Sequence, residues 1–106
     1  MHDQTKATRI DRKTKLKVYE RDGGLCVICH APGLPEAHFI RRSQGGLGIE
    51  ENIVTLCRKC HRDFDETEKR QEYTEKIRAY LDRFYPDFSD YDRTYHKWRK
   101  LAQIEK

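Results

Sequence analysis

Apolar side chains recur at helical spacing through the last third of the chain. A first amphipathic stripe predicts a helix that ends before Pro86, with its inner face formed by Tyr73, Ile77, Tyr80, Leu81 and Phe84. Ser89 is predicted to cap a second helix, with its inner face formed by Tyr91, Tyr95, Trp98 and Leu101. Because stripes at helical spacing usually form buried faces, we expect these aromatic rings to pack in a core and not to stack on bases.

The first two thirds of the chain predict one helix near the start and two short strands in the middle. Residues 11–21 suit a basic helix with Leu16 and Tyr19 on its inner side, ended by two glycines. We expect the polar residues 1–9 to be frayed. A β-like stretch at residues 36–40 is followed by a glycine-rich loop at 41–48 and a second β-like stretch at 52–56. A short helix should start at residues 57–60.

The composition leaves room for only a small core. Of the 106 residues, 36% are hydrophobic and 38% are charged, and a domain of this size often needs an additional staple. No repeat is visible, so we expect one α+β domain over residues 1–106, with a core at 24–66 and a helical extension at 67–106. Neither a signal peptide nor a membrane-spanning stretch is visible, so we expect a cytoplasmic protein with reduced thiols.

The formal net charge of +4 conceals a clustering of the basic side chains. They gather in four groups, which are Lys13 to Arg21, Arg41 with Arg42, Arg58 with Lys59 and Arg62, and Arg93 to Lys100. Such clusters suit a polyanion, because contacts with phosphates release counterions. On charge alone, a solvated surface of mixed charge is the alternative interpretation.

The four cysteines form two pairs, Cys26-x2-Cys29 and Cys57-x2-Cys60, separated by 27 residues. Two such pairs supply four soft thiolates to one tetrahedral zinc ion, and four sulfur ligands leave no open position, so this zinc should be structural. Two disulfides and an iron–sulfur centre are the alternatives, and the first would need an oxidising compartment. The pattern favours zinc.

A second set of polar residues lies between and just after the cysteine pairs. The spacing is His38-x13-Asn52-x8-His61-x3-Asp65, and the segments Arg-Ser-Gln-Gly-Gly-Leu-Gly and Glu-Asn-Ile-Val-Thr-Leu-Cys lie within it. From Cys26 to Asp65 the sequence resembles the HNH endonuclease family, specifically its members with a zinc-bound ββα-metal core. The resemblance implies a ββα-metal core stapled by the four cysteines, flanked by an N-terminal helix and C-terminal helices.

The resemblance also implies a role for each residue of the motif. His38 would be the general base, since a histidine can accept a proton near neutral pH. His61 would bind a divalent cation such as Mg²⁺, Mn²⁺ or Ni²⁺, and Asp65 shares its helical face at i+4. Asn52 would tie the glycine-rich loop back and orient His38. Most family members have a metal-binding Asp or His where this chain has Ala37, with Glu36 as a candidate replacement.

These features together predict a metal-dependent DNA endonuclease that nicks DNA or cuts both strands. Basic residues bordering the site are predicted to contact backbone phosphates, namely Arg41, Arg42, Arg58, Lys59 and Arg62. The alternative is a DNA-binding module with weakened catalysis, or a structural protein that acts with a larger partner, because small proteins similar to this one often accompany phage packaging machinery. The sequence does not reveal the oligomeric state.

Overall fold

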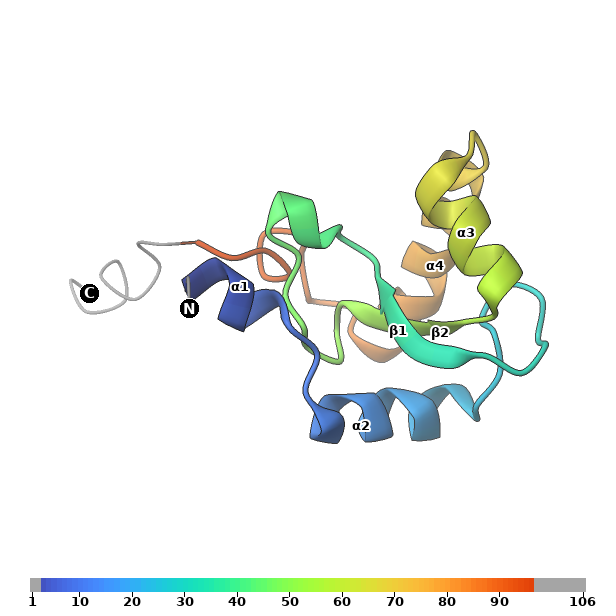
Figure 1. The fold of residues 1–106 in the computed structure, drawn as a ribbon, viewed down its shortest axis with the longest axis horizontal. Helices are drawn as coiled ribbons and strands as arrows, with labels where there is room; N and C mark the ends of the chain where they lie inside the picture. The colour runs from blue at the N-terminus through green and yellow to red at the C-terminus, as the bar shows by residue number, and fades with distance from the viewer. Residues whose placement is uncertain (1–2, 97–106) are drawn as a thin grey trace.

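A computed structural model of the chain describes residues 3–96 and confirms the α+β class (Figure 1). Along the chain the elements are α1 (Asp3–Thr8), α2 (Arg12–Asp22), β1 (Leu34–His38), the 3-10 turn η1 (Arg42–Gln44), β2 (Ile53–Leu56), α3 (Arg58–Glu66) and α4 (Arg70–Phe84). The two strands form a central hairpin, with α2 along one side of it and α3 and α4 together on the other (Figure 1). Among the described residues, no helix is long and apolar enough to cross a membrane.

Helix α2 begins and ends where the sequence predicts, but it buries a different face. The Asp11 carboxylate accepts a hydrogen bond from the Thr14 N–H at its start, and Gly23 ends it in the left-handed conformation at φ 65°. The predicted inner face is wrong, because Leu16 is 55% exposed and Tyr19 is 48% exposed. The buried face instead carries Val18 together with a polar network that an apolar pattern cannot predict.

The expectation that residues 1–9 are frayed is wrong for the described part of that segment. Residues 3–8 form α1, and Thr8 at its end is only 2% exposed. The Gly48 N–H donates to the carbonyl of Ala7, and the Arg42 guanidinium donates to the Thr8 hydroxyl. Hydrogen bonds to residues distant in the sequence therefore order this segment. Its polar composition, taken alone, does not predict that it packs on the rest of the protein.

The hairpin brings the central apolar residues into one core. Strands β1 and β2 run antiparallel, with Ala37 opposite Val54 and His38 opposite Ile53. A bulge between Leu34 and Ala37 shifts the register by one residue. The core joins both strands to α3 and α4, and its buried members include Ala37, Phe39, Val54, Leu56, Phe64, Tyr73, Ile77 and Leu81.

The last third of the described chain holds one long helix, not two. Helix α4 buries Tyr73, Ile77 and Leu81 as predicted, although Phe84 is 44% exposed. The predicted second helix is wrong over the described residues. Ser89 does exchange hydrogen bonds with Asp92, but only turns follow. The rest of that predicted stripe, Trp98 and Leu101, lies outside the described residues.

Residues 93–95 bind to the loop between the strands instead of continuing as a helix. The Tyr95 N–H donates to the Gly45 carbonyl at 2.7 Å, and the Leu47 N–H donates to the Arg93 carbonyl at 2.8 Å. The Arg93 side chain is 1% exposed and donates to the carbonyl of Glu51. Pairing with the loop therefore provides hydrogen-bond partners for backbone N–H and C=O groups of this segment, which a helix would otherwise pair within itself.

A buried ion pair ties α2 to the hairpin and to α4. The Asp22 carboxylate accepts hydrogen bonds from the Arg21 side chain, from the Thr55 N–H and from the Tyr80 hydroxyl. Burial and this carboxylate raise the pKa of Tyr80 to about 12, so the phenol stays a donor. Arg21 also donates to the Ile53 carbonyl at 2.7 Å, so three elements meet at one ion pair.

Replacing Asp22 with alanine should lower the free energy of unfolding by about 3–5 kcal/mol, because the Arg21 guanidinium would remain buried without its carboxylate. Urea unfolding followed by circular dichroism measures the change. The matched control is Asp87→Ala at an exposed position, which should change stability by less than about 0.5 kcal/mol. A loss for Asp22→Ala no larger than that of the control would contradict this role.

Candidate functional site

The four cysteines converge at the point where the hairpin meets α3. Cys26 and Cys29 lie in the turn that precedes β1, while Cys57 caps α3 and Cys60 lies in its first turn. All four are free thiols, and their sulfur atoms lie within 4.8 Å of one another. A tetrahedral zinc with bonds of about 2.3 Å would place its sulfurs roughly 3.8 Å apart, so the group could hold this ion.

Backbone donors around the sulfurs support binding of a cation. Burial raises the pKa of the Cys26 thiol, but N–H groups of Cys29, Cys57 and Ile28 outweigh it and lower that pKa to about 7. The Cys60 N–H donates to the sulfur of Cys57 at 3.4 Å. Burial and the neighbouring thiols raise the pKa of Cys60, as expected where several sulfurs would share negative charge without a cation.

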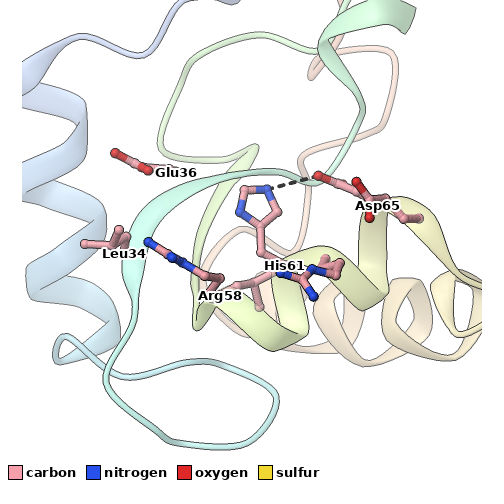
Figure 2. Close-up of a pocket in the computed structure, with 8 residues that line it drawn as sticks. Leu34, Glu36, Arg58, His61 and Asp65 are labelled. Atoms are coloured by element: carbon pink, nitrogen blue, oxygen red, sulfur yellow. Dashed lines mark ion pairs between the residues drawn. The ribbon is translucent and has the colours of Figure 1, made fainter.

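A cleft of about 350 Å³ brings the two predicted histidines to the same place. It is lined by His38, Arg41, Arg42, Ser43, His61 and Asp65. His38 comes from the end of β1, and His61 and Asp65 come from successive turns of α3. The Nε2 atom of His61 lies 3.1 Å from a carboxylate oxygen of Asp65, which Figure 2 shows as a dashed line. One nitrogen and one oxygen atom of the kinds that can bind a metal ion are therefore adjacent on the wall of the cleft.

His38 is half-buried and is held by a backbone carbonyl. Its Nε2 atom lies 2.8 Å from the carbonyl oxygen of Thr8. Burial lowers the pKa of His38 below its ordinary value of 6.5, the Thr8 hydrogen bond opposes this, and the positive charge of Arg42 adds to the lowering. The imidazole is therefore neutral, and able to accept a proton, at neutral pH.

Asn52 is fully buried and fastens the loop that follows His38. Its side-chain oxygen accepts from the Ile40 N–H at 2.8 Å, and its amide nitrogen donates to the carbonyls of Ile40 and Leu47. Its own carbonyl accepts from the Phe39 N–H at 2.8 Å. These bonds fix the backbone directly after His38, so the imidazole side chain is attached to a rigid backbone.

Three side chains or carbonyls near the cleft were not predicted from the sequence. They are Ser43, the Thr8 carbonyl, and Arg70, whose guanidinium lies 3.8 Å from the Asp65 carboxylate. Arg70 also donates to the carbonyl of Phe64. Thr8 precedes His38 by 30 residues, so no local spacing could have connected them.

Ala37, where the family resemblance implies a metal ligand, does not line the cleft. Ala37 is fully buried in the core, opposite Val54. Glu36, on β1, pairs with Lys15 at 3.5 Å and lines a second, neighbouring cleft together with His61 and Asp65 (Figure 2). Over residues 3–96, only the four cysteines form a group of three or more side chains able to hold a metal ion.

The predicted DNA-contacting residues lie on both sides of the His61–Asp65 pair. Arg41 and Arg42 line the first cleft. Arg58 and Arg62 line a neighbouring cleft of about 310 Å³, shown in Figure 2, whose other lining residues are Leu34, Glu36, Leu56, His61, Asp65 and Glu66. Lys59 is exposed on α3 and lines neither of these two clefts.

Comparison with known proteins relates the central segment of the chain to one family. Residues 26–64 match the family model described as HNH endonuclease, and no curated protein matches the chain. The matched segment includes the four cysteines, His38, Asn52 and His61, and it ends one residue before Asp65. HNH domains are nucleases that typically bind DNA. The central segment of the chain, residues 26–64, is therefore similar to HNH endonucleases.

Proposed function

We propose that the chain is a metal-dependent DNA endonuclease in which His38 is the general base. His61 and Asp65 would hold one divalent cation, and the four cysteines would hold a structural zinc. One observation carries the proposal, which is that His38, His61 and Asp65 line a single cleft. Hydrolysis of a phosphodiester needs a base for the attacking water and a positive charge near the leaving oxygen, and this cleft has residues for both.

The donor set of the cleft fits a hard or borderline cation. Mg²⁺ keeps most of its waters and needs only one or two protein ligands, and Mn²⁺ and Ni²⁺ accept the same imidazole and carboxylate. Such a cation would neutralise charge that develops on the phosphate and on the leaving oxygen. His61 and Asp65, whose nitrogen and oxygen atoms lie 3.1 Å apart, are the residues that would bind it.

The activation of the attacking water is the part of the reaction that His38 would perform. Neutral His38 takes one proton from a water molecule, and the resulting hydroxide attacks phosphorus as the bond to the 3′ oxygen breaks. The products expected from the family are a 5′-phosphate and a 3′-hydroxyl. The leaving 3′ oxygen takes a proton from solvent to become the hydroxyl, and the imidazolium of His38 releases its proton to solvent, so His38 is neutral for the next cycle.

Basic residues on either side of His61 would guide the DNA backbone through the site. Arg41 and Arg42 would contact phosphates on one side, and Arg58, Lys59 and Arg62 on the other. Contacts with phosphates carry no sequence information, so low specificity, with nicking or cutting of both strands, is the expected behaviour.

We further propose that residues 1–106 act as one unit in the cytoplasm, with a core at 24–66 and an extension at 67–106.

The burial of Ala37 favours a second candidate function. With no ligand at this position, the cation would have two protein ligands, and the chain would be a DNA-binding module of weak activity that works with a larger partner such as phage packaging machinery. Restoring a carboxylate at this position by Ala37→Asp would not be a useful test of the second function, because it would place a carboxylate in the apolar core. Cleavage by the unaltered protein therefore distinguishes the two functions.

In the presence of Mg²⁺, Mn²⁺ or Ni²⁺, the purified protein should convert supercoiled plasmid to nicked or linear DNA. His38→Ala should lower the rate by about 10²–10⁴-fold, because the general base is lost, without changing the circular dichroism spectrum. His96→Ala, which alters a histidine outside the cleft, is the matched control and should cut like the unaltered protein. Equal cutting by His38→Ala would end the assignment of the base, and no cutting by the unaltered protein would favour the second candidate.

The rate should fall with acidity, but only below the ordinary pKa of histidine. A base acts in its neutral form, and burial with the nearby Arg42 charge holds the pKa of His38 below 6.5. At saturating cation, kcat/KM should therefore be level through neutral pH and drop about ten-fold per unit below that pKa. An acid limb centred above pH 7 would contradict the neutral, buried imidazole.

The purified protein should contain one zinc ion per chain, measured by elemental mass spectrometry. Cys29→Ser changes an exposed ligand and should lower zinc content and melting temperature together, because binding energy at such a site is folding energy. Ser43→Ala, an exposed change away from the sulfurs, is the control. Iron in place of zinc, or two disulfides, would reject the zinc assignment.

A further inference from the structure

The end of α1 reaches the proposed general base from outside the segment that matches the family. The carbonyl oxygen of Thr8 lies 2.8 Å from Nε2 of His38. A carbonyl can only accept a hydrogen bond, so Nε2 must carry the proton when the ring is neutral. The lone pair is then on Nδ1, which has no hydrogen-bond partner among residues 3–96. One backbone carbonyl therefore decides which nitrogen of His38 can accept a proton.

Arg42 holds Thr8 in the position where this contact forms. Its Nε atom donates to the Thr8 hydroxyl at 3.1 Å, and an Nη atom donates to the Thr5 carbonyl at 3.4 Å. The Thr8 hydroxyl in turn donates to the Thr5 carbonyl, which closes the last turn of α1. Arg42 is exposed, yet its planar head is committed to α1 by two contacts.

Gly48 holds the following backbone from the other side. Its N–H donates to the Ala7 carbonyl at 3.1 Å. A Cβ atom at this position would lie 2.2 Å from the Arg9 carbonyl oxygen and 2.9 Å from the Ile10 nitrogen, so no larger residue fits without moving the segment. The backbone of residues 7–10 is thus pressed between the loop and His38.

We propose that residues 7–10 are part of the active site, with Thr8 as a positioning residue that fixes the tautomer and orientation of His38. Arg42 acts through Thr8, in addition to any contact with phosphate. The inference rests on the proposed role of His38 as general base. It adds a functional element that the family match, which starts at residue 26, does not include.

Long-range ¹H–¹⁵N spectra of the histidine rings test the geometry without any need for cleavage. At a pH above its pKa, His38 of the unaltered protein should show a single tautomer protonated at Nε2. Gly48→Ala should turn this into a mixture of tautomers, because the added methyl group displaces the Arg9 carbonyl. Gly23→Ala is the control: it costs stability because Gly23 has a left-handed φ of 65°, but its methyl group would have no atom within 4 Å, so the His38 tautomer should be unchanged.

Thr8→Val gives a second arm if Gly48→Ala does not fold. Valine keeps the shape and the carbonyl but loses the hydroxyl that Arg42 holds, so a partial mixture of tautomers is expected. An Nδ1-protonated or mixed ring in the unaltered protein would overturn the proposal. An unchanged single tautomer in every folded variant would overturn it too.

Kinetics then separate positioning from DNA binding. Arg42→Gln should lower kcat roughly ten-fold, a part of the 10²–10⁴-fold that a general base supplies, in addition to any rise in KM from a lost phosphate contact. Arg41→Gln, the neighbouring arginine in the same cleft, should mainly raise KM. An Arg42→Gln variant that raises KM alone would show Arg42 to be only a phosphate contact. If the chain does not cut DNA at all, the proposed function fails while the tautomer result still stands.

Discussion

The structure depends on four thiols that must meet within 4.8 Å of one another. Cys26 and Cys29 come just before the hairpin, and Cys57 and Cys60 come just after it, so their convergence closes the hairpin into a loop with fixed ends. Cys57 is also the N-cap of α3, which sets where that helix starts. His61 follows directly, and its position relative to the strand that carries His38 is a consequence of this closure.

The opposite end of the hairpin is fixed by hydrogen bonds instead of sulfur. Asn52 fastens the loop from within, Arg93 fastens it from the C-terminal side, and Gly48 meets α1 from the N-terminal side. Two of these three contacts are made to residues outside 26–64. The matched segment supplies the motif, while residues before and after it hold the loop on which the cleft is built.

The local features of the sequence predicted most of the fold. Cysteine spacing, the Asp11 and Gly23 caps of α2 and the apolar stripe of α4 act over a few residues, so the pattern contains them. The inner face of α2 was wrong because a buried Arg21–Asp22 pair, not apolar side chains, occupies it. A pattern of hydrophobic positions cannot show that a charged pair will be buried, since this depends on partners distant in sequence.

The same limit applies to the candidate site. Motif spacing gave His38, Asn52, His61 and Asp65, and the structure gathers three of them in one cleft with Asn52 buried behind the loop. Motif spacing could not predict the contact of the Thr8 carbonyl with His38, because every residue has a backbone carbonyl and Thr8 is distant from the motif in sequence. The turns at residues 89–96 were missed because pairing with the loop competes successfully with helix formation.

The most direct test of the account is to locate the proposed catalytic cation. Crystals of the zinc-loaded protein with a short DNA and Mn²⁺ should show anomalous scattering from an ion bound by the His61 nitrogen and the Asp65 carboxylate, in the cleft that His38 lines. An ion bound elsewhere, or none in that cleft under conditions in which the same protein cuts DNA, would contradict it.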